Sequence, residues 1–323
     1  MGVKTDVSKI SKLEYIHANE DATHTLMERV FKPWLWDNTS FNMLPMGRKL
    51  KEDLRIIFQF NDDIINGRKR ALALERRDNP KMDKEKTAGY KDKKAFLDIL
   101  LDASESDSNP FDDQDLKDEM ATFLFEGHDT VTSAMSFTLY LLGHHREIQE
   151  KCFDELEQIF KGSDRKPTME DLQKMKYLEQ VIKEGLRLFP SVPLLSRRVT
   201  QDIPMGNNYV VPAGAELILH VHLLHRDPAY FPNPEKFDPD RFSPENCATR
   251  HPFAFVPFAA GSRNCIGQKF AMMEEKIVFS YILRNFIVES VGDLNDLKVV
   301  FGLIIRSKKT LYVQFKPRTS FPT

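Results

Sequence analysis

The sequence predicts a mainly α-helical protein with a minor β part. Apolar residues recur at helical spacing over most of the chain, whereas short segments of alternating apolar residues occur only in its second half. Hydrophobic residues make up 41% of the 323 residues, which is enough to bury a substantial core. Disorder is therefore excluded as a general description of this chain.

Charge and cysteine content exclude several classes of protein. The 46 basic and 48 acidic residues nearly cancel, whereas a protein that neutralises nucleic-acid phosphates should be clearly basic. Cys152, Cys247 and Cys265 are far apart and form no C-x-x-C pair, which excludes a disulfide framework and an all-cysteine zinc site and indicates a reducing compartment. No apolar run reaches the roughly 18 residues that cross a bilayer, and the first residues do not resemble a signal peptide.

Helices are predicted for most of the first half. Residues 1–77 are helical with interruptions at prolines, and residues 48–77 carry the apolar stripe of an amphipathic helix. The polar segment 75–94 is predicted to be a surface loop. Residues 112–144 form the longest helical pattern. It begins with acidic residues, as the helix dipole favours, and then becomes apolar on nearly all sides, so it should be buried on most faces.

The second half combines helices with the predicted strands. Prolines end the second predicted helix of this half, and a Pro-Gly turn lies in the segment that is predicted to form strands. The predicted order is a helix over 145–160, a helix over 169–189, short strands over 196–225, an irregular proline-rich segment over 226–264, a helix over 266–285 and a closing strand near 310–315.

A polar cluster interrupts the apolar middle of the longest helix. It consists of Glu126, Gly127, His128, Asp129 and Thr130. Buried polar groups are costly unless they are paired, so this cluster is a candidate functional site. Helical spacing places Glu126 and Thr130 on one face, and the missing side chain of Gly127 lets a ligand approach the backbone. The alternative is a local kink in which the threonine hydroxyl bonds to the helix backbone.

The segment PFAAGSRNCIGQKF contains the most informative cysteine. Gly261 and Gly267 flank Cys265, and a helix is predicted to begin just after it. The glycines let the backbone pass close to a flat ligand, and the positive end of the helix favours a thiolate. A buried structural cysteine is the alternative, and Phe258 and Arg263 at their fixed offsets weigh against it.

Phe258-x-x-Gly261-x-Arg263-x-Cys265-x-Gly267 resembles the haem-binding signature of the cytochrome P450 monooxygenases. The resemblance implies the fold of that family and haem b, with Cys265 as the thiolate ligand of the iron. It also implies a structural network, because Glu184-x-x-Arg187, followed downstream by Arg241 in FDPDRF, matches the family's Glu–Arg–Arg set. Without the resemblance, Glu184 and Arg187 would be interpreted as an ordinary surface pair.

The polar cluster has a counterpart in the same family. The resemblance implies that Asp129 and Thr130 are the acid–alcohol pair that relays protons during O₂ activation. FLFEGHDT is similar to the fourth P450 family, of the fatty-acid ω-hydroxylase and insect type, in which the glutamate at the place of Glu126 can form an ester to haem. Arg263, and Arg197 beside Arg198, match family contacts to the haem propionates.

The implied function is that of a haem-thiolate monooxygenase. It would insert one oxygen atom from O₂ into a C–H bond of a fatty acid, another lipid or a xenobiotic, as in detoxification. Electrons would come from NADPH through NADPH–cytochrome P450 reductase, with cytochrome b5 as a second partner. The resemblance implies membrane association on the cytosolic face of the endoplasmic reticulum for the full-length protein.

Two other functions remain open at this point. One is a truncated, non-catalytic fragment that binds haem weakly or not at all. The other is a haem-thiolate isomerase or dehydratase, against which the Asp129–Thr130 pair argues. The chain is expected to be a single P450 domain over residues 1–323 that lacks the family's N-terminal anchor, first strands and propionate-binding helix.

Two further sets of residues have weaker functional interpretations. By resemblance, Phe123–Phe125 and Pro193–Leu195 line the substrate pocket, although ordinary core packing accounts for them equally well. His220 and His222 are predicted to share a strand face and could bind a metal ion, but no nearby Cys, Asp or Glu completes a ligand set.

Overall fold

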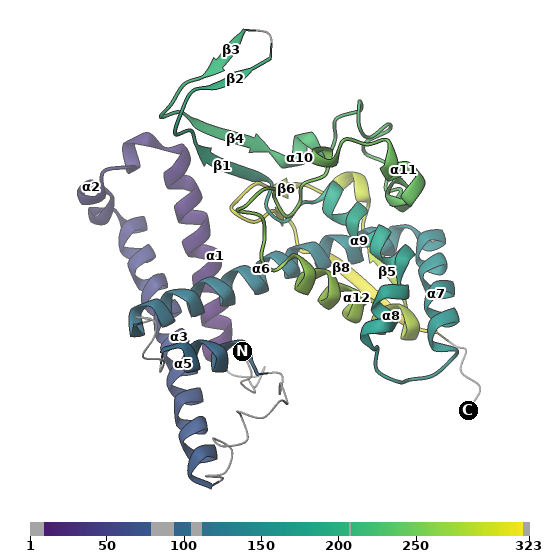
Figure 1. Ribbon diagram of the computed structural model, residues 1–323, viewed down its shortest axis with the longest axis horizontal. Coiled ribbons are helices and arrows are strands. Elements are labelled where there is room, and N and C mark those ends of the chain that lie inside the picture. Colours follow the sequence, from purple (N-terminus) through teal and green to yellow (C-terminus); the bar gives the residue numbers. More distant parts are fainter. Residues whose placement is uncertain (1–9, 79–93, 105–111, 207, 319–323) are drawn as a thin grey trace. The chain divides into compact units, whose positions relative to one another are not determined.

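The computed structural model describes residues 10–78, 94–104, 112–206 and 208–318, and the chain divides into two compact units, residues 1–126 and 127–323. We call them unit 1 and unit 2. Helices predominate and the strands are few and short, which confirms the predicted class (Figure 1). Most of the predicted surface loop, residues 79–93, lies outside the described residues. That residues 1–323 form one domain stays a prediction.

Unit 1 is helical throughout its described part. The apolar stripe predicted for residues 48–77 packs α3 against α1, with Leu50 and Ile57 buried, and α3 begins at Pro45, whose fixed φ suits the first turn of a helix. The helices of this unit are α1 (Ile10–Phe31), η1 (Pro33–Leu35), α2 (Asn38–Met43), α3 (Pro45–Asp78), α5 (Phe96–Ser104) and the first part of α6 (Asp113–His144).

Unit 2 is built around the remainder of α6. Its core contains Phe137 from α6, Cys152 from α7, Val181 from α9 and Phe279 from α12, each at most 2% exposed. Burial raises the pKa of the Cys152 thiol, so this cysteine is an inert core residue. The helices are α7 (Arg146–Phe160), α8 (Met169–Lys174), α9 (Lys176–Leu188), α10 (Val221–Leu224), α11 (Pro244–Ala248) and α12 (Gln268–Asn285), with short η2 (Pro239–Phe242), η3 (Pro252–Ala254) and η4 (Leu294–Asp296).

The helix predicted over residues 169–189 is two helices, which corrects that prediction. Met175, between α8 and α9, has φ −72° and ψ 73° and is therefore outside the helical region. The carboxylate of Glu155 in α7 accepts hydrogen bonds from the backbone N–H groups of Tyr177 (2.6 Å) and Leu178 (3.0 Å). A side chain from another helix thus caps the start of α9, and no local pattern predicts that contact.

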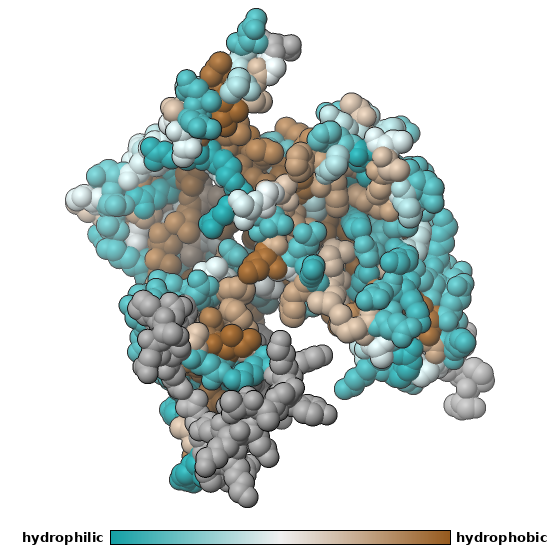
Figure 2. Space-filling view, in the orientation of Figure 1, coloured by the Kyte–Doolittle hydropathy of each residue, from teal (hydrophilic) through white to brown (hydrophobic). Residues whose placement is uncertain are grey.

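The strands of the described residues form four antiparallel pairs. In the hairpin β2–β3, Met205 and Val210 are more than half exposed, and apolar surface is visible there at the top of Figure 2. The pairs are β1 (Leu194–Arg198) with β4 (Glu216–His220), β2 (Ile203–Met205) with β3 (Tyr209–Val211), β5 (Phe286–Val291) with β8 (Tyr312–Pro317), and β6 (Val299–Val300) with β7 (Arg306–Ser307).

The segment predicted to be irregular, residues 226–264, contains three short helical turns. Each begins at a proline, Pro239 in η2, Pro244 in α11 and Pro252 in η3. Proline favours the first position of a helix, where its missing N–H costs nothing. The proline-rich composition therefore produces short turns that precede the cysteine segment.

Candidate functional site

The loop that precedes α12 presents Cys265 to solvent. The backbone N–H of Cys265 donates to the carbonyl oxygen of Phe258 at 2.9 Å, and the N–H of Asn264 donates to that of Gly261 at 3.2 Å. Gly261 has φ +89°, in the left-handed region that glycine adopts without strain. These bonds fix a tight loop whose cysteine side chain is exposed. The helix begins at Gln268, two residues later than predicted.

The surroundings of Cys265 fit a flat apolar cofactor. Ile266 is 82% exposed and Phe270 is 66% exposed, so two large apolar side chains close to Cys265 in the sequence are available to contact a ligand. A side chain at Gly261 would meet no atom within 4 Å, so the backbone there is open to a ligand. Phe258 is half-buried and packs against the core of unit 2, and this contact anchors the loop.

The two arginines predicted to hold propionates are both accessible. Arg263 is exposed in the cysteine loop. Arg197 is exposed on β1, where its Nη1 donates to the carbonyl oxygen of Ser196 at 2.8 Å, and Arg198 beside it is exposed as well. Either guanidinium can bind a carboxylate of a ligand, because the planar fork of arginine matches two oxygen atoms.

The polar cluster of α6 is only partly buried. Glu126, Gly127 and His128 are exposed, Asp129 is buried and Thr130 is half-buried. The prediction that this helix is buried on most faces is therefore wrong at Glu126, Gly127 and His128. A side chain added at Gly127 would meet no atom within 4 Å, which leaves the helix backbone open there. Sequence hydrophobicity does not reveal that Glu126, Gly127 and His128 are exposed.

Electrostatics link the polar cluster to the helix that follows the cysteine loop. Partial burial raises the pKa of the Glu274 carboxyl in α12, and His128 in α6 opposes that rise. The side chains of His128 and Glu274, both in unit 2, therefore interact electrostatically.

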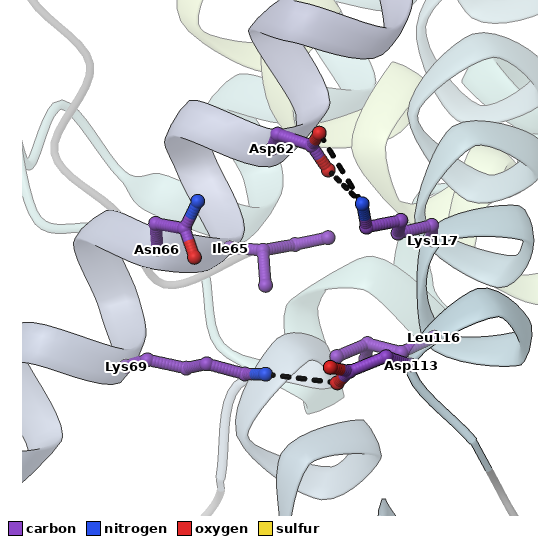
Figure 3. Close-up of a pocket in the computed structure, with 7 residues that line it drawn as sticks. All are labelled: Asp62, Ile65, Asn66, Lys69, Asp113, Leu116 and Lys117. Atoms are coloured by element: carbon purple, nitrogen blue, oxygen red, sulfur yellow. Dashed lines mark hydrogen bonds and ion pairs between the residues drawn. The ribbon is translucent and has the colours of Figure 1, made fainter.

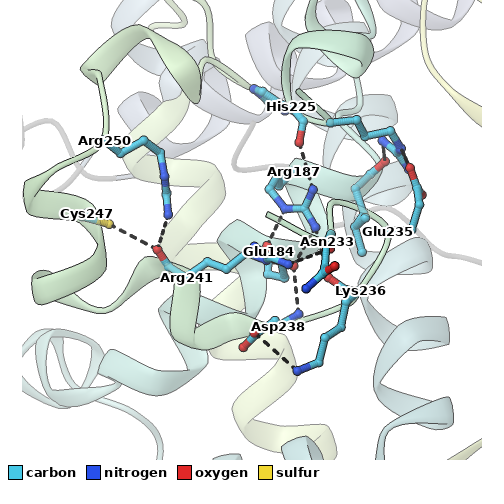
Figure 4. A network of polar contacts seen from close by, with 12 residues as sticks. Glu184, Arg187, His225, Asn233, Glu235, Lys236, Asp238, Arg241, Cys247 and Arg250 are labelled. Carbon is cyan, nitrogen blue, oxygen red and sulfur yellow. Dashed lines mark hydrogen bonds and ion pairs between the residues drawn. The ribbon is translucent and has the colours of Figure 1, made fainter. Parts of the chain in front are cut away.

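The predicted glutamate–arginine pair lies fully buried at the centre of a polar network (Figure 4). Nε and Nη2 of Arg187 donate to the two carboxylate oxygens of Glu184 at 2.7 and 2.8 Å. The same guanidinium donates from Nη1 to the carbonyl oxygen of His225 (2.9 Å) and from Nη2 to that of Lys236 (3.2 Å). Arg187 thus ties α9 to the segment that leads to the cysteine loop, and a lysine could not make all these bonds.

The third predicted member joins the same carboxylate. Nε of Arg241 lies 3.5 Å from Oε1 of Glu184, and Nη2 of Arg241 donates to the carbonyl oxygen of Asn233 at 2.8 Å. The backbone N–H of Asp238 donates to Glu184 at 2.9 Å. Burial raises the pKa of Glu184, and Arg187 and Arg241 oppose that rise. The structure brings all three predicted residues together.

Two members of this network were missed by the sequence analysis. His225 is fully buried, and its Nε2 accepts the backbone N–H of Val256 at 2.9 Å. Burial and the positive charge of Arg187 lower the pKa of His225 to about 3, so the ring is neutral. Arg250 lies over the ring of Phe231, 4.6 Å from its centre, and donates to the carbonyl oxygen of Arg241 at 2.6 Å. The only signals in the sequence are a histidine at the end of the strand-rich segment and an arginine in the proline-rich segment.

The two histidines considered for metal binding do not share a strand face, which corrects that prediction. His220 ends β4, whereas His222 lies in α10. Nδ1 of His222 is 3.2 Å from Nη1 of Arg226, and its ring lies 4.9 Å from that of Phe301. Burial and the charge of Arg226 lower the pKa of His222 to about 4. Within the described residues, no group of three His, Cys, Asp or Glu side chains could hold a metal ion.

The predicted substrate-lining residues have ordinary packing partners. The ring of Phe123 lies 4.1 Å from that of Phe96 in α5, and Leu124 packs on a buried cluster of unit 1. Pro193 is buried, whereas Leu194 and Leu195 are half-buried on β1. Core packing thus accounts for Phe123 and Leu124.

A small pocket of about 140 Å³ lies in unit 1 between α3 and α6 (Figure 3). Lys117 forms an ion pair with Asp62 at 3.1 Å, and Lys69 forms one with Asp113 at 3.0 Å, so the charges in it are matched. It is lined by Asp62, Ile65, Asn66, Lys69, Asp113, Leu116 and Lys117. It contains none of the predicted site residues.

Among all described helices, none combines the length and apolarity needed to cross a membrane.

Comparison with known proteins identifies the family. The cytochrome P450 family model matches residues 1–315, and the chain belongs to this family. Membership implies haem iron bound by a cysteine thiolate. It confirms the predicted fold class and the class of cofactor. The roles assigned to individual residues stay predictions.

Three similar proteins are animal cytochromes P450 whose names begin with the number 4. The chain is 42% identical over 321 residues to human cytochrome P450 4V2, covering 99% of this chain and 61% of that protein. It is also 42% identical to cytochrome P450 4c3 of Drosophila melanogaster (98% and 60% covered) and 42% identical to cytochrome P450 4c21 of Blattella germanica (98% and 63% covered). The chain thus spans about three fifths of the length of these relatives.

Proposed function

We propose that this chain belongs to a haem-thiolate monooxygenase that inserts one oxygen atom from O₂ into a C–H bond of a lipid or xenobiotic. The observation that carries the proposal is the exposed Cys265, held by its backbone bond to Phe258 in an open glycine-flanked loop before α12. A cysteine side chain at this place is accessible to a metal ion.

The surrounding side chains have matching roles in cofactor binding. Cys265 is the ligand of the haem iron, and Gly261 and Gly267 leave room for the porphyrin beside the loop. Arg263 and Arg197 bind the propionates through their exposed guanidinium groups. The buried network of Glu184, Arg187 and Arg241 does not contact the cofactor. It fixes the segment from which the cysteine loop extends.

The haem supplies O₂ activation when bound, and the protein supplies orientation and protons. Asp129 and Thr130 are the proton relay. The Asp129 carboxylate is buried in α6, and the Thr130 side chain is half-buried next to it in sequence. An acid held away from bulk solvent can direct a proton along one route.

The narrower parts of the proposal rest on the resemblance to the fourth P450 family. The substrate is a fatty acid hydroxylated at or near its end, and Glu126, exposed on α6, is the residue that would hold haem through an ester. Electrons come from NADPH through NADPH–cytochrome P450 reductase, with cytochrome b5 as a second partner. The enzyme works at the cytosolic face of the endoplasmic reticulum membrane.

The first test compares two exposed cysteines of the same chain. The wild type, Cys265→Ser and the matched control Cys247→Ser are expressed with a haem precursor, and the difference spectrum of the reduced protein with CO is recorded. We expect a thiolate-type Soret band in the wild type and the control and none in Cys265→Ser. An unchanged band in Cys265→Ser would overturn the assignment of the ligand, and no band in any of the three would favour a non-catalytic fragment.

The second test addresses the reaction and the ester. With reductase, O₂ and a fatty acid, hydroxylated product should form only when NADPH is present, whereas an isomerase would act without NADPH. Haem that stays with the protein in acid and is released from Glu126→Ala supports the ester. Glu119→Ala, an exposed glutamate two turns earlier in α6, is the control and should retain the haem.

A further inference from the structure

A single arginine holds the carboxylate of Asp129. Nη2 of Arg306 in β7 donates to Oδ1 of Asp129 at 2.7 Å and to Oδ2 at 2.8 Å. The Asp129 side chain is 10% exposed and that of Arg306 is 35% exposed. One guanidinium nitrogen therefore contacts both carboxylate oxygens. Asp129 is the only charged residue of the polar cluster that is buried.

Hydrogen bonds hold the backbone on both sides of this ion pair. Oγ of Ser191 donates to the carbonyl oxygen of Thr130 at 2.7 Å, and the N–H of Ile305 donates to the carbonyl oxygen of Ser191 at 2.9 Å. Oγ of Ser133 donates to the carbonyl oxygen of Ile305 at 2.8 Å. The segment of Ile305 and Arg306 is thereby joined to α6 directly and through Ser191.

The two sets of contacts have different chemical consequences. The serine bonds fix the distance between α6 and the 305–306 segment, and they involve backbone carbonyl groups that cannot move a proton. The Arg306 contact instead reaches the carboxylate itself and sets the direction of its oxygen atoms. A carboxylate that must pass a proton to a defined neighbour depends on that direction.

We propose that Arg306 is the positioning residue of the proton relay, holding the Asp129 carboxylate in the orientation from which it serves Thr130. This inference rests on the proposed monooxygenase function. In it, the carboxylate takes a proton from water and passes one on through the Thr130 hydroxyl, so that Asp129 is unchanged after each transfer. Arg306 moves no proton and binds no substrate.

The positioning role predicts a specific kinetic pattern. In the haem-loaded chain with reductase and NADPH, Arg306→Gln should lower kcat by between about tenfold and a hundredfold and leave KM within about twofold. The solvent isotope effect on kcat should rise, because proton transfer becomes slower. Arg306→Lys should restore part of kcat, since it keeps a cation in the same place. Lys308→Gln, an exposed lysine two residues away, is the control and should match the wild type.

A stability cycle tests the ion pair without any turnover. Urea unfolding is measured for the wild type, Asp129→Asn, Arg306→Gln and the double variant. We expect the double variant to lose clearly less than the sum of the single losses. Additive losses, or an Arg306→Gln enzyme with wild-type kcat and isotope effect, would overturn the positioning role. A wild-type chain that has haem but no NADPH-dependent product would instead overturn the proposed function, so the two failures are distinguishable.

Discussion

Replacing Glu275 by glutamine should stabilise the protein, and more so as the pH rises. Glu275 lies in α12 and is 1% exposed. Its Oε2 has no hydrogen-bond partner within the described part of the chain. Burial, with a smaller contribution from the charge of Glu274, raises the pKa of this carboxyl to about 8. The folded protein therefore keeps a proton on Glu275 at pH values at which an exposed glutamate has lost it.

The size of the effect follows from this difference in pKa. The carboxyl titrates near 4.5 in the unfolded chain and at about 8 in the folded protein. Its contribution to stability is complete below the lower value and is lost as the pH rises toward the upper one. With 1.36 kcal/mol per pKa unit, the loss is about 1 kcal/mol by pH 5 and about 3 kcal/mol by pH 7. Glutamine does not titrate and escapes this loss.

Urea unfolding between pH 5 and pH 8 measures the effect. The free energy of unfolding of Glu275→Gln minus that of the wild type should rise by about 2 kcal/mol from pH 5 to pH 7. Glu157→Gln, at an exposed site in α7, is the control and should show no such rise. A difference that is independent of pH would refute the reasoning, because it would mean that Glu275 titrates alike in both states.

Two further predictions concern the packing of α9. Glu184→Gln leaves the buried guanidinium of Arg187 without its carboxylate and should lower the free energy of unfolding by about 3–5 kcal/mol in urea, whereas Glu170→Gln in an exposed pair should cause no resolvable change. Gly185→Ala would place a methyl group 2.1 Å from Oγ1 of Thr138 and should cost about 1–3 kcal/mol in thermal unfolding, much of which the double variant with Thr138→Ala should recover. Wild-type stability in Glu184→Gln, or no recovery in the double variant, would contradict the packing described.

The long helices could be predicted because their own sequence determines them. In α3 the apolar residues recur at helical spacing and become the buried face, with Ile57 and Ile65 among them. In α6 the acidic start and the long apolar pattern gave the observed helix to within one residue at its start. Local periodicity suffices for such elements, because a helix needs only a continuous apolar stripe.

Elements that depend on distant contacts could not be predicted in this way. The break at Met175 depends on Glu155, which lies twenty residues earlier and caps the next helix. The burial of His225 depends on Arg187, which binds its carbonyl oxygen across 38 residues. In both cases a polar group is satisfied by a partner from another element. The sequence shows that the partner is needed, but it does not show which residue provides it.

The same distinction separates the two halves of the candidate site. The cysteine loop is local: Phe258, Gly261 and Cys265 lie within eight positions, and backbone bonds from Cys265 to Phe258 and from Asn264 to Gly261 close the loop, so the spacing alone predicts it. The contact that holds the acid of the polar cluster is not local. The partner of Asp129 is Arg306, which lies 177 residues away in a two-residue strand that no sequence pattern predicts. A short motif can therefore indicate where a cofactor binds, because all of its members are neighbours in the chain. The orientation of the Asp129 carboxylate is set by tertiary contacts, and for this reason no sequence pattern points to Arg306.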